Sequence, residues 1–132
     1  QFAEGGTYVD PNVGEKLQGD EIGEYVEETI EGFPDVHFEE DRVMQTEIEG
    51  EFGLVVEWTM HGTHDGPLEG LPPTGKTITL DGVDIVTISE DGITSITGYF
   101  DQQQFAQQLG LTFPAIIGQL PTLAVGAARQ AL

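Results

Sequence analysis

The segment from Ile93 to Gly110, ITSITGYFDQQQFAQQLG, decides the fold because it joins an alternating, strand-like run directly to a short glutamine-rich helix. Asp101 stands at the junction. We expect a sheet to hold this residue on one side and a helix N-terminus on the other, which fixes its carboxyl group well enough for chemistry. Asp101 and Gln104 also form the Asp-x-x-Gln pattern of a capping box, so the same carboxylate has a purely structural alternative.

Upstream of this segment, one stretch has the spacing of an amphipathic helix. Asp20 begins it, and Gly32 with Pro34 ends it. Its apolar residues follow at i, i+3, i+4 and i+8, and are Ile22, Tyr25, Val26 and Ile30. Before the helix, residues 1 to 19 are rich in glycine and predict a loop with at most a short extended piece around Tyr8.

Between the two helices the sequence alternates with a period of two, which predicts strands. The breaks are a turn at Glu49–Glu51, a proline- and glycine-rich loop at Asp65–Gly75, and a tight hairpin turn at Glu90–Gly92. Strands that follow one another without intervening helices form an antiparallel meander. We therefore expect one α+β domain over residues 1–132, with one helix before the sheet and one after it.

The chain is strongly acidic, with 24 Asp and Glu residues against four Lys and Arg residues, and a formal net charge of −20. Such a surface repels phosphate backbones and anionic lipids, so we expect no nucleic acid and no membrane as partner. Hydrophobic residues make up 38% and are patterned, which separates the chain from disordered acidic segments. Acidic, lysine-poor surfaces suit molar salt, where screening acts within about 3 Å, so we expect a halophilic source.

The absence of cysteine excludes disulfides and thiolate metal sites. The N-terminal residues lack the pattern of a signal peptide, and no apolar run approaches the roughly 18 residues of a membrane span. We therefore expect a cytoplasmic location.

Four motifs stand in register along the second half of the chain: Gly62-Thr63-His64, Pro73-Thr74-Gly75-Lys76, Asp91-Gly92-Ile93, and Asp101 followed by Gln108-Leu109-Gly110. In their order and spacing, residues 8–110 resemble the SnoaL-like polyketide cyclase family, also called ester cyclase-like. The resemblance implies a nuclear transport factor 2-like fold, in which a curved antiparallel sheet wraps around helices to form a cone with a pocket in its open end. Family members begin with a further helix, which we expect to be short or missing here.

The resemblance also implies a chemistry. In the polyketide cyclases, an aspartate at the position of Asp101 acts as general acid and base in an intramolecular aldol ring closure, without metal or organic cofactor. An acid at the mouth of an apolar cone is desolvated, which raises its pKa towards neutrality. His64 would donate to a substrate oxygen or orient Asp101, and its structural alternative is a histidine bonded to the neighbouring loop.

Aromatic residues on the strands and the first helix are the candidates for substrate binding. Trp58 and Tyr99 would line the cone, Tyr25 would close it, and His61 would lie in its wall. Tyr99 shares strand parity with Asp101, so if Asp101 points into the cavity, Tyr99 should do so as well. Packing in the core is the alternative for the three aromatic residues.

No metal site is expected, because strand parity places His61 and His64 on opposite faces unless the strand bends at Gly62, and no His-x-His or Glu-x-x-His pattern occurs. We expect His37 on the strand surface. Two hypotheses follow from the sequence. One is a cofactor-free cyclase or isomerase that acts on a small hydrophobic carbonyl compound, and the other is a non-catalytic ligand-binding or dimerisation module with the same fold. We expect a homodimer, in which the apolar extension at residues 111–132 covers the domain or a neighbouring subunit.

Overall fold

The computed structural model describes residues 1–68 and 70–111, so that all but Leu111 of the apolar extension lies outside the described residues. In chain order the elements are β1 (Phe2–Val9), β2 (Leu17–Gln18), α1 (Asp20–Gly32), β3 (His37–Ile48), β4 (Glu51–Thr63), β5 (Thr77–Ser89), β6 (Gly92–Phe100) and α2 (Gln102–Gln108).

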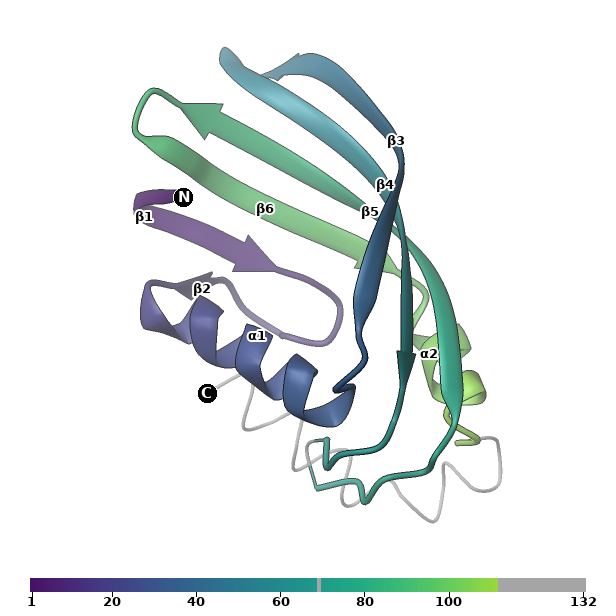
Figure 1. The fold of residues 1–132 in the computed structure, drawn as a ribbon. Coiled ribbons are helices and arrows are strands. Elements are labelled where there is room, and N and C mark those ends of the chain that lie inside the picture. Colours follow the sequence, from purple (N-terminus) through teal and green to yellow (C-terminus); the bar gives the residue numbers. More distant parts are fainter. Residues whose placement is uncertain (69, 112–132) are drawn as a thin grey trace.

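The strands form one curved sheet in the order β2-β1-β6-β5-β4-β3 (Figure 1). The run from β3 to β6 is the predicted antiparallel meander. The sheet as a whole is mixed, because β1 pairs with β6 in parallel where the sequence predicted mostly loop. Gly6 permits this pairing, since a Cβ at that position would lie 2.6 Å from the carbonyl oxygen of Ile93.

Both predicted hairpin turns are present. Ile48 pairs with Glu51, which leaves Glu49 and Gly50 as a two-residue loop with φ of 51° and 82°. Two consecutive positive φ angles give the turn whose twist matches that of the flanking strands. A second two-residue loop joins Ser89 to Gly92.

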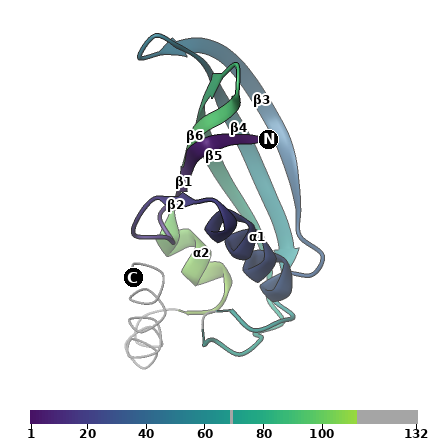
Figure 2. The same cartoon turned by 90° about the vertical axis from the view of Figure 1, so that its left-hand side faces the viewer.

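Helix α1 has the predicted bounds and lies across the concave side of the sheet (Figures 1 and 2). Its apolar stripe is only partly covered by the described residues. Tyr25 is half-buried, whereas Val26 and Ile30 are about half exposed.

Helix α2 begins and ends with well-formed caps. Asp101 accepts hydrogen bonds from the backbone N–H groups of Gln103 and Gln104. At the other end, Gly110 has a φ of 82°, and the N–H of Leu111 reaches back to the carbonyl of Ala106. This pairing is the Schellman arrangement, which satisfies carbonyls that the helix leaves free.

The core lies between the concave face of the sheet, the end of α1, the loop before β5 and α2. Its buried members are Phe33, Trp58, Met60, Leu71, Ile78, Leu80, Leu109 and Leu111. Side chains alternate between the two faces along β4, and the even-numbered ones Val56, Trp58 and Met60 point to the concave side.

Candidate functional site

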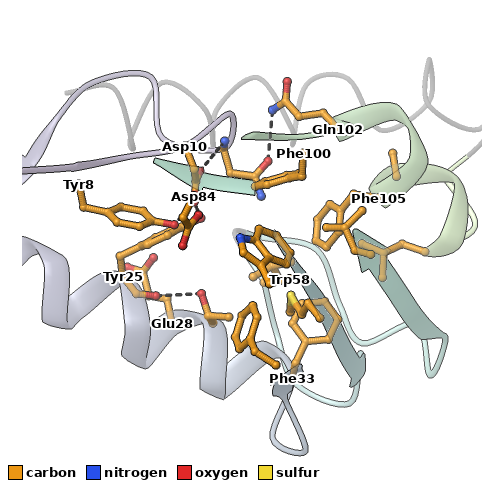
Figure 3. A pocket seen from close by; sticks show the side chains of 18 of the residues that line it. Tyr8, Asp10, Tyr25, Glu28, Phe33, Trp58, Asp84, Phe100, Gln102 and Phe105 are labelled. Carbon is orange, nitrogen blue, oxygen red and sulfur yellow. Dashed lines mark hydrogen bonds between the residues drawn. The ribbon is translucent and has the colours of Figure 1, made fainter. Parts of the chain in front are cut away.

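A cavity of about 790 Å³ occupies the concave side of the sheet. Its volume lies within the range of small-molecule sites, roughly 300–1,000 Å³. Aromatic side chains form much of its wall, and Figure 3 shows Phe33, Trp58, Phe100 and Phe105 around the same space. Trp58 packs edge-on against Phe38, with ring centroids 5.5 Å apart. Such a wall suits a flat, largely apolar ligand.

Two aspartates, Asp10 and Asp84, lie together in this wall. They flank Gly98 on β6. Gly98 pairs with Asp84 of β5, while the preceding residue, Thr97, pairs with Val9 of β1. A Cβ at position 98 would lie 3.0 Å from Oδ1 of Asp84 and 3.3 Å from Cβ of Asp10, so a glycine between them gives both acids room.

Asp10 is the centre of a hydrogen-bond network and is only 7% exposed. The hydroxyls of Tyr8 and Tyr25 donate to its Oδ2 at 2.8 and 2.7 Å, and the backbone N–H of Asn12 donates to its Oδ1 at 2.8 Å. Burial raises the pKa of both tyrosines, and the charge of Asp10 raises it further. The two phenols therefore stay protonated and act as hydrogen-bond donors.

Asp84 has a different environment. Burial raises its pKa above the ordinary value, the neighbouring Asp10 adds to the rise, and the Trp58 side chain acts in the opposite direction. The Trp58 indole lies beside it in Figure 3. A carboxyl group that is partly desolvated in an apolar cavity can exchange a proton closer to neutral pH than an exposed one.

The structure places the predicted site residues in three different environments. Trp58 and Tyr25 line the cavity, as the sequence predicted, and their role in binding substrate stays a prediction.

Asp101 is exposed and caps α2, and it does not line the cavity. Tyr99, at 55% exposure, lies on the outer face, so its predicted orientation is corrected. The reason is the phase of β6, in which Gly98 and Phe100 face inward. This geometry fits the capping alternative for Asp101, and a role in proton transfer stays a prediction.

His64 is completely buried and also stands apart from the cavity lining. Its Nδ1 accepts a hydrogen bond from the backbone N–H of Thr74 at 3.2 Å and lies 3.0 Å from the hydroxyl of the same residue. Burial lowers its pKa, which favours the neutral ring. This contact matches the alternative of a histidine that holds the loop before β5. His61 points to the outer face of β4, beside His37 and Glu39.

Sequence reasoning did not assign a catalytic or binding role to Asp10, Tyr8 or Asp84. Asp10 precedes Pro11 and resembled a loop residue. For Asp84 a signal was present, because it shares strand parity with Leu80 and Val86, which are buried. An acid at an inward position of an alternating strand indicates a buried carboxyl group.

The curved sheet, the helix across its concave side and the apolar cavity define an α+β domain whose fold is similar to solved structures described as nuclear transport factor 2-like and ketosteroid isomerase-like. Three solved structures show this likeness. A protein assigned as a SnoaL-like polyketide cyclase, from a Jannaschia species, has a TM-score of 0.72 at 20% identity, over 84% of this chain and 74% of that one.

A protein assigned as a polyketide cyclase, from Acidithiobacillus ferrooxidans, has a TM-score of 0.63 at 25% identity, over 79% of this chain and 75% of that one. A hypothetical protein with a ketosteroid isomerase-like fold from Catenulispora acidiphila, in complex with trimethylamine, has a TM-score of 0.68 at 21% identity, over 84% and 78%.

The family described as SnoaL-like polyketide cyclase matches residues 2–109, and the chain belongs to it. No curated protein matches the sequence. Neither described helix has the length and apolar character that crossing a membrane requires.

Proposed function

We propose that the protein is an enzyme of the cyclase or isomerase type that transfers protons on a small hydrophobic carbonyl compound, with Asp84 as general acid and base. The observation that carries the proposal is the raised pKa of a carboxyl group set in an aromatic cavity. Membership of the SnoaL-like polyketide cyclase family supports the reaction type. The family resemblance implies that no cofactor takes part.

The reaction requires a general base and a hydrogen-bond donor in the same wall of the cavity. Asp84 would remove a proton from the carbon next to a carbonyl group and return it at another position. Negative charge then develops on the carbonyl oxygen. Tyr8 and Tyr25 line the same cavity in protonated form, so either hydroxyl can exchange its hydrogen bond to Asp10 for one to this oxygen.

A ligand-binding module without catalysis is the second candidate. The volume and the aromatic wall of the cavity support it, because both suffice for binding without any proton transfer. The fold hosts many functions and does not choose between the two candidates.

The test is hydrogen–deuterium exchange of enolisable ketones, followed by proton NMR in D₂O with wild type, Asp84→Asn and Asp101→Asn. We expect Asp84→Asn to lose about 10²- to 10⁴-fold in exchange rate, as for the loss of a general base. Asp101→Asn should keep the rate within about threefold. It is the matched control, since asparagine caps helices as well as aspartate does.

The other two outcomes would contradict the assignment of proton transfer to Asp84. A large loss in Asp101→Asn with a retained rate in Asp84→Asn would refute the proposal and support the aspartate that the sequence suggested. Ketones that quench the fluorescence of Trp58, the single tryptophan, but exchange no faster than in buffer would support the binding module.

A further inference from the structure

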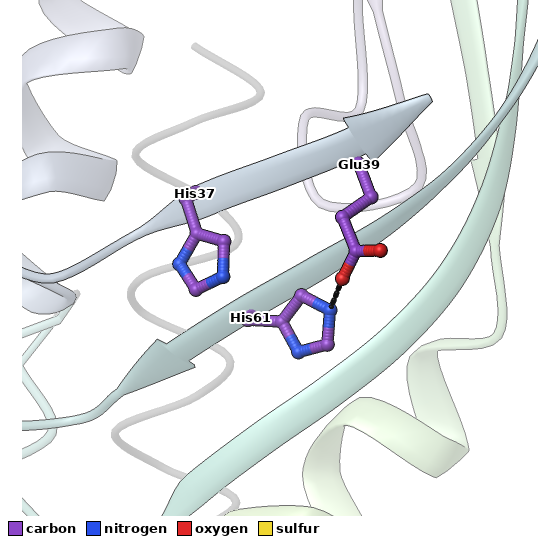
Figure 4. Close-up of side chains that lie close together, drawn as sticks. All are labelled: His37, Glu39 and His61. Carbon is purple, nitrogen blue, oxygen red and sulfur yellow. Dashed lines mark ion pairs between the residues drawn. The ribbon is translucent and has the colours of Figure 1, made fainter. Parts of the chain in front are cut away.

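Three side chains that can bind a metal ion meet on the outer face of the sheet, on β3 and β4 (Figure 4). His37 and His61 are direct partners in the β3/β4 ladder, and their rings stack with centroids 4.8 Å apart. Glu39 follows two residues after His37 and projects on the same side, with its Oε1 2.5 Å from Nε2 of His61. One donor atom from each residue lies within 4.8 Å of the other two.

This separation is close to what a metal ion needs. With Zn–N bonds of 2.0–2.1 Å and tetrahedral angles, donor atoms around zinc are about 3.4 Å apart. The widest of the three separations therefore has to close by about 1.4 Å, and the contact between Glu39 and His61 has to open by about 0.9 Å; side-chain rotation supplies both movements. The carboxylate has the freedom for this movement, since the Glu39 side chain is 60% exposed.

The first histidine is already oriented. Nδ1 of His37 lies 3.3 Å from the backbone carbonyl of Asp35. A carbonyl oxygen only accepts hydrogen bonds, so this contact favours the tautomer of the neutral ring that has its proton on Nδ1 and a free lone pair on Nε2. A histidine held through its other nitrogen in this way is the usual arrangement in metal sites.

We infer that His37, Glu39 and His61 form a binding site for a divalent first-row metal ion of the zinc type. Two imidazoles and one carboxylate leave a fourth position for water or an exogenous ligand. Imidazole nitrogen prefers such ions over Mg²⁺ and Ca²⁺, which prefer oxygen ligands. The carboxylates elsewhere on this surface do not make this distinction, because they attract any divalent cation. Strand parity along the sequence separates His61 from His64 but does not predict the pairing of His61 with His37, which depends on the β3/β4 register.

The site is independent of the proposed function. On β4 the side chains alternate, so His61 faces outward while Trp58 and Met60 face the cavity. Loss of enzymatic proton transfer would leave the metal site unaffected, and the reverse also holds.

The experiment is a titration of the full chain with Zn²⁺ alone, followed by the imidazole nitrogen signals in long-range ¹H–¹⁵N NMR. The chain has three histidines, and the buried His64 serves as internal control. We expect one equivalent of Zn²⁺ to shift the signals of His37 and His61 and to leave those of His64 unchanged.

Affinities by isothermal titration calorimetry test each ligand. His37→Gln and His61→Gln should each weaken Zn²⁺ binding by at least about tenfold, the lower bound for changes around a metal site. Glu39→Gln should weaken it more than Glu47→Gln, the matched control, which removes the same charge from the same strand away from the site. Equal effects of the two glutamate variants, or no shift of the His37 and His61 signals, would overturn the inference.

Discussion

Replacing Gly82 with alanine tests whether the wall around Trp58 is as tightly packed as the structure shows. The two residues pair across β4 and β5, and a Cβ at position 82 would lie 2.2 and 2.3 Å from two carbons of the indole ring. Ordinary contacts begin at 3.4 Å. The ring would therefore have to move by roughly 1 Å, and its neighbours would have to repack.

Two effects of opposite sign compete in this variant. Alanine in place of a strand glycine stabilises by roughly 0.5–1 kcal/mol through the unfolded chain. Overpacking a buried side chain costs about 1–3 kcal/mol. Because Trp58 is only 9% exposed, we expect the clash to prevail and the free energy of unfolding to fall by about 1–2 kcal/mol.

Urea unfolding, followed by the fluorescence of the single tryptophan, measures both the stability and the environment of the ring. Gly23→Ala is the control, because its new Cβ on α1 meets nothing within 4 Å. That variant should gain up to about 1 kcal/mol, and its native emission should not change. If Gly82→Ala were as stable as wild type with unchanged native emission, Trp58 would not lie against this position.

Three further predictions concern charge and hydrogen bonding. Because burial raises the pKa of Asp84, the folded protein holds this proton more tightly, and the free energy of unfolding falls as pH rises from 3.8 through the folded pKa. Asp84→Asn should therefore be more stable than wild type at pH 7 and lose this advantage near pH 3.8; equal urea midpoints at pH 7 would contradict this. Tyr25→Phe removes a 2.7 Å hydrogen bond to Asp10 and should cost about 1.5–3 kcal/mol in urea unfolding, as for bonds to charged groups. A loss below about 0.5 kcal/mol would mean that water replaces the hydroxyl. With a net charge of −20, the melting temperature should rise between low and molar KCl, and an unchanged value would argue against salt adaptation.

Local patterns predicted most of the elements. Helix α1 and strands β3 to β6 follow from periodicity and from turn residues such as Gly50, which are properties of short segments. Strand β1 was missed because its pairing with β6 joins residues far apart in the sequence, and because Gly5 and Gly6 interrupt any alternation.

The candidate site was less predictable because it depends on the phase of single strands and on pairing between them. A shift of one residue along a strand moves a side chain to the opposite face of the sheet. The assumption that Asp101 points inward therefore led to the same prediction for Tyr99, two residues before it. Asp10, Gly98 and Asp84 lie side by side because β1 pairs with β6 and β6 pairs with β5, and sequence periodicity does not predict the first of these pairings. Trp58 and Tyr25 were located correctly, since each belongs to a long and strongly periodic element.

The position of β3 at the edge of the sheet has a consequence for solubility. Every residue from His37 to Glu47 is exposed, and no described strand pairs with the outer side of β3. A long edge strand is a template onto which a second chain can add. Its acidic residues, Glu39, Glu40, Asp41 and Glu47, oppose such addition while they are charged. Acidification towards the isoelectric point of about 4.1 removes that repulsion, so mild acid is the condition under which copies of this chain should first join edge to edge.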